Sequence, residues 1–153
     1  MTTPKILTNI SLACGKVFFN ENVRIVGGVP AIQGSWPASV LISINSIGSF
    51  QKSGLTLEAT QSFTCAGTLL DAYTILTAAH CILTEFYTIY DYEYIKATVK
   101  NPFESSQYTV YVGVYNNSFL NNGDKPKSPA VKMAVETVIR VNRLKILILT
   151  LIF

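Results

Sequence analysis

Alternation of apolar and polar residues with a period of two marks the best-patterned parts of this chain. Val40, Ile42 and Ile44 alternate with Ser39, Leu41, Ser43 and Asn45, which are polar except for Leu41, as in a strand that buries one of its faces. The same period returns at 108–114 and at 131–141. Since successive side chains of a strand point to opposite faces, each segment can bury one apolar row. The pattern therefore predicts a strand in each of these three places.

A further hairpin is predicted between them, with strands at 63–70 and 73–77 joined at Asp71 and Ala72. A short helical turn is expected to follow at 78–81. Loops are expected at two other places because glycine, serine, proline and Asn-Gly gather there: 47–61 and 116–129.

Two stretches fit the pattern less clearly. The stretch 82–108 is rich in tyrosine, and a tyrosine stripe of this kind is more often a half-buried strand than a binding platform. This stretch is longer than expected after the preceding hairpin, which predicts an insertion. The stretch 144–153 is almost wholly apolar, but ten residues that include Lys145 are too short to span a bilayer. It is interpreted either as a buried strand or as a misplaced tail.

Composition narrows the class of protein. A chain of 153 residues is one domain, or part of a larger one, and can bury a core. Apolar residues make up 49% and charged residues 14%, which argues against broad disorder. The net charge is +3 and no basic cluster is interleaved with aromatic residues, so we expect no nucleic-acid partner.

The chain has three cysteines and one histidine, His80. An odd cysteine count in an exported protein indicates an unpaired thiol or a missing partner. Cys65 and Cys81 enclose the predicted hairpin, and a disulfide closing about 16 residues would stabilise the fold by roughly 3 kcal/mol. Two buried free thiols are the alternative. One histidine and three dispersed cysteines form no ligand cluster in sequence, so neither a metal nor a cofactor is expected.

The segment from Cys65 to Cys81, CAGTLLDAYTILTAAHC, resembles the segment that carries the general base in trypsin- and chymotrypsin-like serine peptidases. In that family a Cys-Gly-Gly-Ser-Leu strand leads into Thr-Ala-Ala-His-Cys, and here only Ala66 and Thr68 depart mildly from the pattern. The resemblance implies an all-β fold, the N-terminal six-stranded antiparallel Greek-key barrel of the trypsin-like fold without its C-terminal barrel. It also implies a Cys65–Cys81 disulfide. His80 would be the general base that takes the proton of a catalytic serine.

The string from Arg24 to Gly28, RIVGG, resembles the activation junction of a zymogen in the same family. Cleavage between Arg24 and Ile25 would free an ammonium group that can pair with a buried carboxylate. An ordinary strand edge before a Gly-Gly turn is the alternative. The resemblance divides the chain into a propeptide (1–24) that contains Cys14, a barrel (25–141) and an atypical apolar tail (142–153).

The chain departs from the family near its end. Where the family has Asn-Asp-Ile-Ala-Leu, alignment on the apolar tail puts Lys145 at the aspartate position. A cation there would oppose the imidazolium that the mechanism forms. No Gly-Asp-Ser-Gly-Gly motif follows, so the chain alone is expected to be inactive in peptide-bond hydrolysis.

Two other interpretations remain open. One is a non-catalytic interaction module built from a single protease barrel, and the other is a change of reading frame after Arg140. By resemblance, the partners would be a polypeptide substrate or an activating protease, and the location would be extracellular. No secretory signal is evident in 1–15. Glycosylation sequons begin at Asn9 and Asn116.

Overall fold

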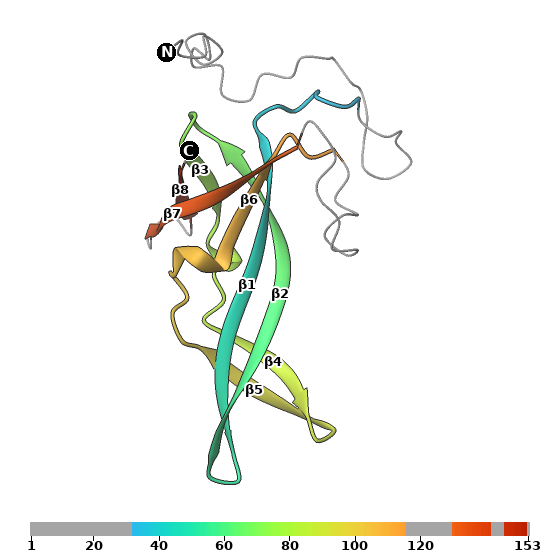
Figure 1. The fold of residues 1–153 in the computed structure, drawn as a ribbon, viewed down its shortest axis with the longest axis vertical. Coiled ribbons are helices and arrows are strands. Elements are labelled where there is room, and N and C mark those ends of the chain that lie inside the picture. The colour runs from blue at the N-terminus through green and yellow to red at the C-terminus, as the bar shows by residue number, and fades with distance from the viewer. Residues whose placement is uncertain (1–31, 116–129, 142–145, 153) are drawn as a thin grey trace.

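The computed structural model describes residues 32–115, 130–141 and 146–152, which form antiparallel sheet without an α-helix (Figure 1). The strands are β1 (Ser39–Lys52), β2 (Leu55–Leu69), β3 (Thr74–Ala78), β4 (Glu85–Tyr90), β5 (Glu93–Val99), β6 (Tyr108–Val112), β7 (Val131–Val141) and β8 (Ile146–Ile152). Two short 3-10 turns accompany them: η1 (Ala79–Cys81) and η2 (Ser105–Gln107). In these three ranges, no helix has the length and apolar character needed to cross a membrane.

Six of the strands close into a barrel. Going round the ring, β1 is followed by β2, β3, β8, β7 and β6, and β6 pairs with β1 again. Every one of these pairings is antiparallel. The six-stranded antiparallel barrel that the family resemblance implied is therefore confirmed.

The core of the barrel is built from the residues that the period of two singled out. Val40, Ile42 and Ile44 are all buried on the inner face of β1. They pack with apolar side chains from across the ring, such as Ile75 and Leu149. Removing one such side chain from water contributes roughly 1.5–3 kcal/mol. The predicted β1 face is thus the centre of the main core.

The apolar stretch near the end of the chain supplies the strand that closes the ring. β8 lies between β3 and β7, and Leu149 and Leu151 on this strand are buried. Of the two interpretations of this stretch, the buried strand is the one observed. A bulge between Val135 and Thr137 adjusts the register of β7 against β8.

β1 and β2 continue beyond the barrel as a long two-stranded arm (Figure 1). Their register runs without a break from Ser39–Thr68 to Lys52–Leu55, and the turn between them has positive φ at Ser53 (52°) and Gly54 (78°). The loop predicted at 47–61 is therefore wrong. The polar side chains of this segment face water, while its backbone N–H and C=O groups form hydrogen bonds with the partner strand. A composition typical of loops therefore did not prevent strand pairing.

The tyrosine-rich stretch forms the β4–β5 hairpin, which pairs with β1 only at Gly48 and Ser49. One face of this hairpin packs on the arm and forms a second, smaller core. The arm contributes Phe50 to this core, and the hairpin contributes Phe86, Ala97 and Val99. The strand prediction is confirmed, but the expected half-burial is wrong for three of the tyrosines. Tyr87 and Tyr94 lie on the opposite face and Tyr92 at the tip, with exposed fractions of 67%, 78% and 98%. Tyr90 is 43% exposed and packs against Phe50 of the arm, with ring centroids 5.6 Å apart.

Candidate functional site

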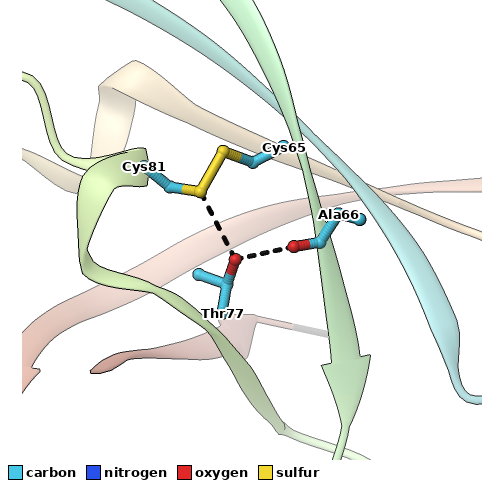
Figure 2. Close-up of a disulfide and its surroundings, with 4 residues drawn as sticks. All are labelled: Cys65, Ala66, Thr77 and Cys81. Carbon is cyan, nitrogen blue, oxygen red and sulfur yellow. Dashed lines mark hydrogen bonds between the residues drawn. A yellow bond between two sulfur atoms is a disulfide. The ribbon is translucent and has the colours of Figure 1, made fainter. Parts of the chain in front are cut away.

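A disulfide between Cys65 and Cys81 joins the barrel wall to the turn that follows β3 (Figure 2). Cys65 belongs to β2 and Cys81 is the last residue of η1, and their Cα atoms are 6.1 Å apart. Cys81 is buried in the main core, whereas Cys65 is half-buried beside it. The bond therefore anchors the end of η1 to a neighbouring strand.

His80 is the middle residue of η1, between the half-buried Ala79 and the buried Cys81. The backbone leaves β3 in an extended conformation at Ala78 and then closes one 3-10 turn, in which the N–H of Ile82 donates to the carbonyl of Ala79 at 3.1 Å. This is the helical turn predicted at 78–81. In this turn His80 is exposed, whereas the next residue, Cys81, is buried in the core. The imidazole can therefore contact a ligand while its backbone is fixed by Cys81.

Thr77 provides a second link between β2 and the histidine turn. Its hydroxyl donates a hydrogen bond to the carbonyl of Ala66, with an O–O distance of 2.6 Å (Figure 2). The same oxygen lies 3.5 Å from Sγ of Cys81. Sequence reasoning assigned Thr77 only as part of a motif and missed these contacts, because they depend on the register of β2 against β3.

The surroundings of Gly67 explain why the motif has a glycine two residues after the first cysteine. A Cβ atom at this position would lie 2.8 Å from Cγ2 of Ile75 and 3.0 Å from Cδ1 of Ile42. Both neighbours are fully buried core side chains. The missing side chain lets β2 approach the core closely enough to pair with β1 on one side and β3 on the other.

The register of β8 bears on the acidic partner that a catalytic histidine requires. Ala78, the last residue of β3, pairs with Ile146, the first residue of β8, so the start of β8 lies beside the end of β3 that leads into η1. Lys145, which the resemblance puts at the aspartate position, precedes Ile146 and lies outside the described residues. Within the described part of the chain the His80 ring has neither a hydrogen bond nor an ion pair.

Cys65, His80 and Cys81 lie close enough together to be mistaken for a metal site. Ligand atoms of Cys65, His80 and Cys81 all lie within 4.8 Å of one another. The two sulfurs are bonded to each other, however, and a cysteine binds metal as a thiolate. With the disulfide formed, this cluster holds the histidine in place and offers a metal only one nitrogen ligand.

Several residues singled out in the sequence lie outside the described ranges: Asn9, Cys14, Arg24, Ile25 and Asn116. Their roles as sequons, propeptide cysteine and cleavage junction stay predictions. The division into a propeptide, a barrel and a tail stays a prediction as well.

The closed barrel and the disulfide-held histidine turn define the class, a trypsin-like β-barrel of the serine peptidase type. Comparison with known families agrees, because the model of the Trypsin family matches residues 25–136. The chain belongs to the trypsin family.

Similar proteins are chymotrypsin-like. Chymotrypsin-C from Bos taurus is 32% identical over 123 residues, which are 73% of this chain and 40% of that protein. Chymotrypsin-like elastase family member 1 from Rattus norvegicus is 34% identical over 68 residues, 44% of this chain and 21% of that protein. The human protein of the same name is 36% identical over 61 residues, 40% of this chain and 19% of its own length. The chain thus spans less than half the length of each of these relatives.

Proposed function

We propose that this chain is the histidine-bearing portion of a trypsin-like serine endopeptidase, in which His80 is the general base for peptide-bond hydrolysis. The observation that carries the proposal is the exposed imidazole on a turn fixed by the Cys65–Cys81 disulfide. An imidazole titrates near neutral pH, so it can accept a proton from a serine hydroxyl and return it to the leaving amine. Held in this way, it needs little reorganisation to reach the reacting groups.

The serine and the aspartate of the mechanism have no counterpart that we can assign in these 153 residues. A histidine without them cannot activate a nucleophile or stabilise its own charged form during the reaction. We therefore expect a fluorophosphonate probe to leave the isolated chain unlabelled. Stoichiometric labelling of the chain would show that a reactive serine has been overlooked.

The direct test uses the longest natural transcript that contains this sequence, expressed as a secreted protein and assayed on peptide substrates. We predict hydrolysis by that protein and a loss of at least about 10⁴-fold in kcat for His80→Ala, since the base acts together with the nucleophile. Replacement of another exposed residue of the barrel, Thr64→Ala on β2, is the control and should leave kcat unchanged. Equal activity of wild type and His80→Ala would contradict the proposal.

A zymogen is part of the proposal. Cleavage after Arg24 would free the amino group of Ile25, and this new ammonium could pair with a buried carboxylate. We predict that brief treatment with trypsin yields a chain whose N-terminal sequence begins at Ile25, and that Arg24→Gln abolishes this product. Lys16→Gln, at another basic residue of the N-terminal stretch, should not. Preferential cleavage elsewhere in both variants would argue against an activation junction.

An extracellular location is proposed on related grounds. The Cys65–Cys81 disulfide requires an oxidising compartment to form and persist. The resemblance of the histidine segment to that of trypsin-like peptidases implies the same location.

One observation favours a second function, a non-catalytic homologue that binds polypeptides. Alignment on the apolar tail puts Lys145 at the aspartate position, a cation in place of the acid that the base requires. A transcript that encodes no serine motif, together with binding of polypeptide but no hydrolysis, would support this second function over the first.

A further inference from the structure

We infer that Thr77 is a positioning residue for His80, acting through the backbone of η1. Thr77 lies on β3, three residues before the histidine, and it is buried although its side chain is polar. Its hydroxyl donates to the carbonyl of Ala66 at 2.6 Å, which satisfies both groups (Figure 2). The inference rests on the proposed function, because a fixed orientation matters for His80 only if it acts as a base.

The hydrogen bond lies where backbone pairing stops. Residue pairs between β2 and β3 run from Leu69–Ile75 to Gly67–Thr77 and end there. The next residue of β2 toward the disulfide is Ala66, and its carbonyl is bonded by the Thr77 side chain. The Thr77 hydroxyl therefore extends the contact between β2 and β3 by one residue of β2, close to the point where the chain enters η1.

The same oxygen also contacts the turn itself, since Sγ of Cys81 is 3.5 Å away. A hydroxyl has one proton to donate, and the carbonyl is the closer and stronger acceptor, so the sulfur contact is chiefly packing. Thr77 is thus fixed by β2 on one side and lies against the last residue of η1 on the other. It restrains the departure of η1 from β3 independently of the covalent bond between the two cysteines.

His80 is the only histidine of the chain, so its ring signals in a nitrogen NMR spectrum need no assignment by mutation. The variants to compare are Thr77→Ser and Thr77→Ala, which both lack the methyl group and differ by one hydroxyl. We expect wild type and Thr77→Ser to give one sharp set of His80 ring signals, and Thr77→Ala to give broadened or doubled signals. Thr137→Ala is the control, because this barrel threonine shares its hydrogen bond with Thr150 on β8 and should leave the His80 signals unchanged.

Reduction of the disulfide separates the two restraints. We expect reduced wild type to keep its His80 signals and reduced Thr77→Ala to lose them. The inference would be overturned if Thr77→Ala gave wild-type His80 signals in both redox states. It would also be overturned if reduction of the wild type abolished these signals, because the disulfide would then be the sole restraint on His80. If Thr77→Ala unfolds by circular dichroism while Thr77→Ser does not, the hydroxyl serves the stability of the whole barrel and the local role is wrong. Failure of the proposed function would appear separately, as a full-length protein without peptidase activity whose His80 signals behave as described.

Discussion

Among the described residues, Tyr108 is the one whose ionisation the barrel perturbs most clearly. It opens β6, its ring is part of the main core, and its hydroxyl donates a hydrogen bond to the carbonyl of Pro102 at 2.6 Å. Burial disfavours the charged phenolate and raises the pKa of Tyr108 to about 12. A buried tyrosine of this kind is compatible with the fold only while it is neutral.

This pKa predicts a dependence of stability on alkaline pH. An unfolded tyrosine has a pKa of about 10, so between about pH 10 and pH 12 the unfolded chain loses a proton that the folded chain retains. The stabilisation by neutral Tyr108 is complete below about pH 10 and is lost as pH rises through the folded pKa. We expect Tyr108→Phe to show a shallower fall in the free energy of unfolding over this range, measured by urea titration. Tyr94→Phe, at an exposed tyrosine, should follow wild type, and parallel curves for all three proteins would contradict the assignment.

Among the elements, the β4–β5 hairpin has the most demanding backbone. Its turn residues Asp91 and Tyr92 both have positive φ, 50° and 63°, the combination found in the tightest hairpin turns and best accommodated by Asn-Gly. Tyr92 is nearly fully exposed, so contacts of its ring within the described chain offset little of this strain. The hairpin is stabilised instead by its inner face, where Phe86 and Ala97 pack against the arm.

Glycine at the turn should therefore strengthen this hairpin. We predict that Tyr92→Gly stabilises it by about 1 kcal/mol, because glycine adopts positive φ without the clash of a Cβ atom. The measurement is slower hydrogen exchange of the β4 and β5 amides. Tyr94→Gly is the matched control, because Tyr94 lies within β5 where glycine weakens a strand, and it should speed exchange. The turn would not be strained if both substitutions acted in the same direction.

At the scale of the whole molecule, stability depends on closing the ring with β8. This strand is supplied late in the sequence yet lies between β3 and β7, and without it the two would present open edges. Leu149 is fully buried at the centre of β8 and pairs with Ile75 on one side and Val138 on the other. The core that supports the histidine turn is therefore shared between residues far apart in the sequence.

Truncation of this side chain should affect the entire barrel. We predict that Leu149→Ala lowers the free energy of unfolding by about 2–5 kcal/mol through lost burial and the cavity that it leaves. Ile152→Ala on the same strand is the control, since Ile152 is 52% exposed and should cost less than about 1 kcal/mol. Urea unfolding followed by circular dichroism measures both. A similar loss for the two variants would mean that β8 is peripheral to the core.

The sequence by itself determined the strands whose apolar residues alternate and the segment that carries the histidine. Val40, Ile42 and Ile44 are buried as the pattern predicted, because alternate side chains of a strand point to the same face. This alternation is a local property that the sequence shows directly. The helical turn at His80 also follows from a short contiguous motif. The pairing of Cys65 with Cys81 came from the family resemblance, since the sequence alone left two free thiols open.

Only the tertiary structure decided which polar segments became strands and which aromatic faces were covered. The segment 47–61 pairs because a partner strand meets its backbone hydrogen bonds, and Tyr87 is exposed because the arm covers only the other face of its hairpin. The place of β8 in the ring and the contact of Thr77 with Ala66 likewise depend on register between strands. Such features arise from distant residues brought together, which the local pattern of a chain does not specify.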